Sequence, residues 1–133
     1  MDIDIKASAI AAAARFENVW QFDDFWKRSN TFHGFLRFVD AAEQRWGRGD
    51  SSLTPMQKLR KTMIDANGTF FDGQIGGVKV WADDYGWCGL SCLEAQSYLR
   101  AVGNGNGADD YLARAGRCWD RMTMTGYDAE DTA

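Results

Sequence analysis

The stretch Trp81–Leu90 reads WADDYGWCGL. Its two adjacent carboxylates, Asp83 and Asp84, precede an apolar segment that keeps helical periodicity as far as Val102. Apolar residues occupy nearly the whole circumference of this segment, which is typical of a buried helix. The sequence therefore predicts a central helix that begins at Asp83 or Asp84, ends near Val102 and stops at Gly103.

Similar periodicity toward the N-terminus predicts two further helices. Apolar side chains recur at helical spacing over residues 5–22 and again over 32–46. Residues 23–30 lack this pattern, so we expect a break between the two helices. Side chains that are suited to cap the second helix lie at the end of the break, namely Ser29, Asn30 and Thr31.

A third helix is expected to begin at Thr54. Pro55 suits the first helical position, and Gln57 completes a capping box with Thr54. A glycine-rich loop is expected over residues 73–77, and a short strand signal spans 74–80.

The last helix is expected over residues 109–124. Its apolar residues form one stripe, which is typical of an outer helix packed on one side. Arg114, Arg117 and Arg121 lie on the opposite face, and we expect that face to be solvated.

These elements predict one all-α domain over residues 1–133, with about five helices in layered helical hairpins. The tail over residues 126–133 is polar and acidic, and we expect it to fray. The alternation of a buried helix with an amphipathic one supports the layered arrangement.

Composition narrows the possible partners and location. The chain carries a formal charge of -4 and has no basic block, which argues against a nucleic-acid partner. No apolar run reaches the ~18 residues of a membrane span, and residues 1–14 lack the features of a secretory signal. We therefore expect a cytoplasmic protein that does not contact a membrane.

The sequence has three cysteines and one histidine, and two interpretations of them are open. A zinc site would require Cys88, Cys92, Cys118 and His33 to converge. The more common arrangement is three small, buried, reduced thiols. We therefore expect no metal and no cofactor. No acidic or serine partner for His33 is apparent in the sequence, so it gives no support to a catalytic triad.

Two interpretations of Asp83 and Asp84 are also open. Aspartate is favoured at the first turn of a helix, where the helix dipole stabilises it, so the pair is first of all a capping pair. The chemical interpretation rests on the neighbouring rings of Trp81, Tyr85 and Trp87. Adjacent carboxyls in a desolvated aromatic pocket can divide into one protonated and one ionised group, which is the division a glycosidase uses.

Residues 80–122 resemble the α-1,6-mannanase-like enzymes of glycoside hydrolase family 76. The residues that carry the likeness are Asp83-Asp84-Tyr85-Gly86-Trp87, Gly89-Leu90, Ala95, Tyr98, the loop 103–107, Tyr111-Leu112, Ala115 and Trp119-Asp120. Cys88 replaces the second tryptophan that is usual in the family.

The resemblance implies a fold and a reaction. The fold would be part of an (α/α)₆ toroid, and Asp83 and Asp84 would be the nucleophile and the general acid/base of a retaining hydrolysis of α-mannan. Trp81, Tyr85 and Trp87 would bind the sugar. Because a partial ring leaves apolar helix faces uncovered, we also expect a homodimer formed through those faces.

Two functions without turnover remain open beside the glycosidase. The chain could be a helical module that binds carbohydrate or another small ligand, and binding would then depend on Trp81 or Trp87 more than on Asp83. It could instead be a homo-oligomeric helical interaction protein, in which Asp83 and Asp84 only cap a helix.

Overall fold

The computed structural model describes residues 4–77 and 81–126. These residues form α1 (Ile5–Phe16), α2 (Phe25–Trp46), a short 3-10 helix η1 (Ser51–Leu53), α3 (Thr54–Gly76), α4 (Ala82–Ala101) and α5 (Gly105–Gly126). The described ranges contain no strand, which confirms the all-α prediction. None of their helices combines the length and apolar character that a bilayer-spanning segment requires. The tail over residues 127–133 lies outside the described residues.

The predicted boundary between the first two helices is wrong. Helix α1 ends at Phe16 rather than Phe22, and the connection that follows brings Trp20 into the core at 3% exposure. Helix α2 begins at Phe25 rather than Phe32, because the Asp24 carboxylate accepts a hydrogen bond from the backbone N–H of Trp26 at 3.2 Å. The expected break over residues 23–30 is therefore mostly helical.

Two of the polar residues that suggested this break, Asn30 and Thr31, form hydrogen bonds inside α2. The Asn30 side chain donates to the carbonyl of Trp26, and the Thr31 hydroxyl donates to that of Lys27. Such bonds to the preceding turn let polar side chains occupy a helix interior. A local signal for caps therefore did not mark a helix end here.

Helix α3 begins at Thr54 as predicted, but its capping and its far end differ from the prediction. Leu53 is its N-cap and offers no side-chain cap, while Gln57 donates to the Glu43 carboxylate at 2.8 Å instead of closing a capping box with Thr54. Pro55 does lie in the first turn. At the other end, the expected glycine-rich loop is helical through Gly76, so the predicted strand is wrong over residues 74–76. Residues 78–80 lie outside the described residues.

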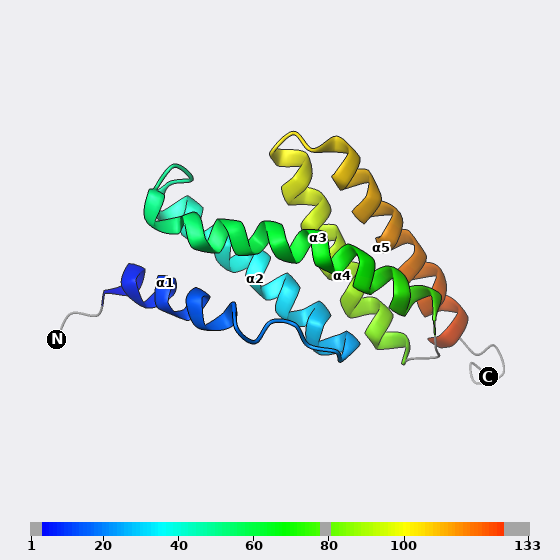
Figure 1. Cartoon of the computed structure of the whole chain (residues 1–133). Helices are drawn as coiled ribbons and strands as arrows, with labels where there is room; N and C mark the ends of the chain where they lie inside the picture. Colours follow the sequence, from blue (N-terminus) through cyan, green and yellow to red (C-terminus); the bar gives the residue numbers. More distant parts are fainter. Residues whose placement is uncertain (1–3, 78–80, 127–133) are drawn as a thin grey trace.

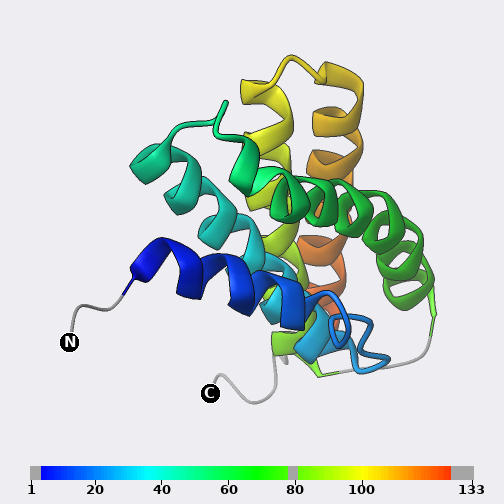
Figure 2. The ribbon, with the colours of Figure 1, turned by 60° about the vertical axis from the view of Figure 1, so that its left-hand side comes forward.

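Helices α4 and α5 form an antiparallel hairpin. They run side by side in both views, and α3 crosses them at a steep angle (Figures 1 and 2). The turn between them uses Gly103 at φ +83°, a conformation that favours glycine, and this confirms the predicted helix stop. Small residues let the helices approach: a Cβ on Gly89 would lie 3.4 Å from the Cβ of Cys118. Helix α5 begins at Gly105, one turn earlier than predicted.

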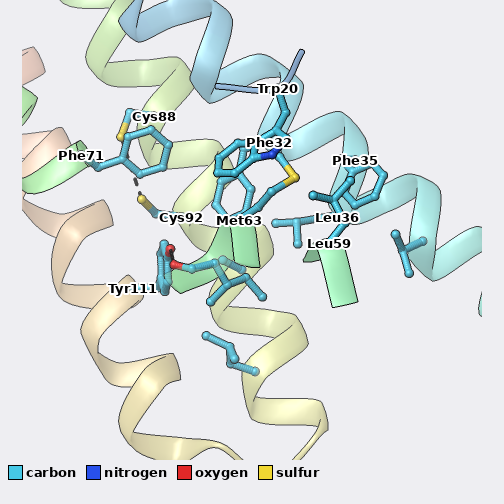
Figure 3. Close-up of a cluster of buried hydrophobic side chains, with 14 of the residues drawn as sticks. Trp20, Phe32, Phe35, Leu36, Leu59, Met63, Phe71, Cys88, Cys92 and Tyr111 are labelled. Carbon is cyan, nitrogen blue, oxygen red and sulfur yellow. Dashed lines mark hydrogen bonds between the residues drawn. The ribbon is translucent and has the colours of Figure 1, made fainter. Parts of the chain in front are cut away.

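Aromatic rings join the helices into one core. Phe32 of α2 lies 5.9 Å from Phe71 of α3 and 6.1 Å from Tyr111 of α5, measured between ring centroids. Phe25 lies 6.0 Å from Tyr85 of α4. Figure 3 shows Phe71, Phe32 and Tyr111 converging with Cys88 and Cys92 of α4. Packing of one stripe from each helix therefore fixes how α4 and α5 lie against the rest.

A buried ion pair links α2 to α3 beside this core. The Arg60 guanidinium donates to both carboxylate oxygens of Glu43, at 2.8 Å and 3.0 Å, and it lies over the ring of Tyr98 at 3.9 Å. Both charged side chains are about 5% exposed. Such a pair is costly to break because either partner alone would be a buried, uncompensated charge.

The arginine face of α5 is only partly solvated. Arg114 and Arg117 both form ion pairs with Asp72 of α3, and Arg114 is 16% exposed whereas Arg117 is 53% exposed. Arg121 donates to the Tyr85 hydroxyl at 3.3 Å. Leu112 and Trp119 of α5 are exposed as well.

Candidate functional site

The carboxylate pair lies in the first turn of α4. Trp81 is the N-cap residue, and its backbone N–H donates to the Asp84 carboxylate at 3.3 Å. The backbone N–H of Asp84 donates to the Trp81 carbonyl at 3.0 Å. Asp84 therefore belongs to a capping box at the start of α4, in line with the interpretation of Asp83 and Asp84 as a capping pair. Asp83 makes no such bond within the described residues and is exposed.

The two carboxyls have unequal surroundings. Burial raises the pKa of Asp84, and the neighbouring Asp83 and the more distant Asp24 raise it further, while the hydrogen bond from Trp81 opposes them. Asp83, by contrast, is open to water. The pKa of Asp84 is thus shifted upward, which is the direction that a general acid needs.

The three aromatic residues predicted to bind sugar do not share one surface. Trp81 is 82% exposed and Trp87 is 42% exposed, so both rings are available to a ligand. Tyr85 is fully buried, packs edge-on against Phe25 and accepts a hydrogen bond from Arg121. Trp81 and Trp87 can therefore stack on a ligand, whereas Tyr85 serves the core.

An apolar groove begins at Asp83 and runs between α4 and α5. It encloses about 490 Å³. Leu90 and Leu93 of α4 line one side, and Trp119 and Met122 of α5 line the other. Among the described residues that line the groove, Asp83 alone is charged, and Asp84 does not reach it. The groove can thus hold an apolar group, with one carboxylate at its mouth.

This groove corrects the prediction that α4 is buried all round. Leu90 and Leu93 are 48% and 44% exposed, and Trp87 and Val102 are also open although the periodicity placed them on the buried face. The buried residues of α4 form a single stripe: Tyr85, Cys88, Ser91, Cys92, Ala95 and Leu99. The sequence does not distinguish an exposed apolar face of a helix from a buried one. It therefore does not predict the groove.

The three cysteines are buried thiols, the more common of the two arrangements that the sequence leaves open. Cys88, Cys92 and Cys118 are all free and buried, and the Cys88 and Cys92 sulfurs are 3.9 Å apart. Burial raises the pKa of Cys88 far above its usual range, so this thiol stays protonated. No group of three or more histidine, cysteine or acidic side chains is placed to hold a metal ion in residues 4–77 and 81–126.

His33 does have an acidic neighbour that sequence spacing did not reveal. Its Nε2 lies 3.7 Å from the Glu94 carboxylate, and both side chains are about one quarter exposed. The pair joins α2 to α4. Neither residue lines the groove at the N-terminal end of α4.

The raised pKa of Asp84 has a measurable consequence for stability. A carboxyl whose pKa is higher in the folded protein than in the unfolded chain destabilises the fold once pH exceeds the unfolded value. We therefore expect Asp84→Asn to retain or slightly raise the free energy of unfolding at neutral pH, and to lose that advantage below about pH 4. Urea unfolding at both pH values checks this.

The matched control is Asp24→Ala, which removes an N-cap of α2 that the Trp26 N–H uses directly. It should lower the free energy of unfolding by about 1 kcal/mol. A loss of stability for Asp84→Asn as large as that for Asp24→Ala at neutral pH would mean that capping outweighs desolvation at Asp84.

Comparisons with known proteins found no match for the chain among protein-family models, curated proteins or solved structures.

Proposed function

We propose that the N-terminal end of α4 is the carbohydrate site of a glycoside hydrolase-like protein. The observation that carries the proposal is the unequal carboxyl pair beside an exposed tryptophan: Asp84 has a raised pKa, Asp83 is open to water, and Trp81 is 82% exposed. The resemblance of residues 80–122 to the α-1,6-mannanase-like family supports the same site. On this proposal the helices are part of an (α/α)₆ ring.

The chemistry assigns a role to each carboxyl. Asp84, whose pKa is raised by burial and by Asp83, would donate a proton to the glycosidic oxygen as the bond to the leaving sugar breaks. Asp83 would attack the anomeric carbon as a carboxylate and form a glycosyl ester, which water then hydrolyses with Asp84 acting as base. A retaining glycosidase holds its two carboxyls about 5–5.5 Å apart, a separation that adjacent residues can reach.

The rings of Trp81 and Trp87 would hold the sugar. A tryptophan face can pack on the apolar face of a pyranose and can stabilise the positive charge that develops at the anomeric carbon. Trp81 is the better placed of the two, since it is the N-cap of the helix that carries both carboxyls. Tyr85 has no direct role, because its side chain is buried.

Binding by Trp81 is tested by calorimetric titration with α-1,6-linked manno-oligosaccharides. We expect Trp81→Ala to weaken binding by roughly tenfold or more, since stacking on an aromatic ring is worth on the order of 1 kcal/mol or more. Val102→Ala is the matched control, because Val102 is an exposed apolar residue at the opposite end of α4. Equal affinities for the two variants would refute the sugar-binding role of Trp81.

A second candidate function is a helical interaction protein without turnover. The observation that favours it is the apolar face formed by Trp87, Leu90 and Leu93 of α4 with Trp119 of α5, which is large for the surface of a small domain. On this alternative Asp84 only caps α4. It predicts no sugar release and no dependence of sugar affinity on Trp81.

A further inference from the structure

The outer face of α4 carries six residues at alternating spacings of three and four. This is the spacing at which one helix contacts another along a continuous line. The leucines at the centre are about half exposed, and the charged residues at the two ends are exposed. We call these residues the α4 seam: Asp83, Gly86, Leu90, Leu93, Ser97 and Arg100.

The α4 seam is complementary to the seam of a second copy that runs in the opposite direction. In such an antiparallel pair Arg100 lies opposite Asp83, and Ser97 lies opposite Gly86. Leu93 also lies opposite Leu90. All three pairs share one midpoint, between residues 91 and 92. A second α4 laid antiparallel about that midpoint would bring leucines together at the centre, small residues on either side, and opposite charges at both ends.

The charges distinguish this arrangement from its alternative. In a parallel pair Asp83 would face the Asp83 of the second copy, and Arg100 would face its own counterpart. Like charges placed opposite each other disfavour a complex, whereas complementary charges fix its register. Arg100 already pairs with Asp109 at 3.1 Å, but both side chains are more than half exposed and leave room for a second carboxylate.

The exposed apolar surface is large enough for a dimer. Trp87 of α4 and Trp119 of α5 line the same groove as the seam leucines, and Leu112 of α5 is also exposed. With Leu90 and Leu93, their exposed parts amount to on the order of 500 Å² per copy. Two copies would bury roughly 1,000 Å² of apolar area before any polar rim is added, which reaches the size of a specific interface.

We propose that the protein forms an antiparallel homodimer through the α4 seam, with the α4–α5 hairpins of the two copies packed face to face. The α4–α5 groove is filled in this dimer by apolar side chains of the second copy. Arg100 of the second copy then lies beside Asp83 at the mouth of the candidate site. The inference does not rest on the proposed function, because it uses only exposure, spacing and charge.

Charge reversal at the seam tests the dimer by sedimentation velocity over a concentration series. We expect the parent to sediment as a dimer, and Asp83→Lys and Arg100→Glu each to weaken dimerisation by roughly tenfold or more. The double variant Asp83→Lys/Arg100→Glu should recover dimerisation, because its exchanged charges again face their opposites. Asp109→Asn, which removes only the pair within one chain, should leave the dimer intact.

Several results would overturn this dimer. These are a monomeric parent at every concentration, single variants that dimerise like the parent, and a double variant no better than the worse single one. Far-ultraviolet circular dichroism establishes that each variant is folded. Because the readout is mass and not sugar release, failure of the dimer and failure of the glycosidase proposal are separate results.

Cross-linking tests the direction of the two helices. Ser97→Cys alone should give no disulfide-linked dimer under mild oxidation, since position 97 faces position 86 of the second copy. An equimolar mixture of Gly86→Cys and Ser97→Cys chains should give one. Rapid cross-linking of Ser97→Cys alone would contradict the antiparallel register. The native cysteines are buried, so they do not compete.

Discussion

Replacing Glu43 with leucine is expected to lower the free energy of unfolding by about 3 kcal/mol or more. The change leaves the Arg60 guanidinium buried without the two hydrogen bonds that it donates to Glu43. Asp40 lies 3.8 Å from Arg60 but is 40% exposed, so it compensates only in part. Urea unfolding followed by circular dichroism measures the effect.

Two further variants show whether the unpaired charge is the cause. Glu43→Leu/Arg60→Met replaces both charges with apolar side chains and should recover most of the loss. Asp65→Ala breaks the exposed Lys61–Asp65 pair and should change stability by less than about 0.5 kcal/mol. A double variant as unstable as Glu43→Leu would show that packing, and not charge, causes the loss.

The Glu43–Arg60 pair also makes the free energy of unfolding depend on pH. Burial alone would raise the pKa of Glu43, but hydrogen bonds from Arg60 and Gln57 outweigh it, and the pKa is lowered. A lowered carboxyl pKa stabilises the fold above the unfolded value, and the stabilisation is lost as pH falls toward the folded value. The difference in free energy of unfolding between the parent and Glu43→Leu should therefore become smaller below about pH 4.

Truncating Phe71 to alanine is expected to cost about 3–5 kcal/mol. Its ring is fully buried and lies within 6.2 Å of the rings of Phe25, Phe32 and Phe70, measured between centroids. Figure 3 shows Phe71 beside Cys88 in the cluster of buried side chains. Thermal and urea unfolding measure the loss.

Val19→Ala is the control for Phe71→Ala, since Val19 is 58% exposed in the connection between α1 and α2. It should change the free energy of unfolding by less than about 0.5 kcal/mol. A small effect of Phe71→Ala would contradict the aromatic core described here, because it would require the surrounding helices to collapse into the vacated space.

The sequence predicts the class of the fold, the start of α1 and α3 and the end of α2, but not where α1 ends, where α2 begins or where α3 ends. Periodicity identifies helices because one apolar stripe must be buried in each. Local capping signals were less reliable: Asn30 and Thr31 satisfy their polar atoms within α2, and Gln57 bonds across to Glu43. The Asn30 and Thr31 bonds exist only because the helix already extends past these residues, and the Gln57 bond depends on a tertiary neighbour.

The candidate site was predictable in part. Asp83 and Asp84 open α4 close to the expected residue, because aspartate suits a first turn whether or not it has a chemical role. The burial of Tyr85 and the exposure of Trp87 were not predictable, because α4 is apolar on both faces. The positions of α2 and α5 together decide which face is covered.

Sugar release from α-1,6-linked manno-oligosaccharides tests the central proposal most directly. The parent should release sugar with retention of the anomeric configuration, and the folded Asp83→Asn/Asp84→Asn variant should release it at least ~100-fold more slowly. No release by the parent, or equal release by parent and variant, would contradict a glycosidase site at the start of α4.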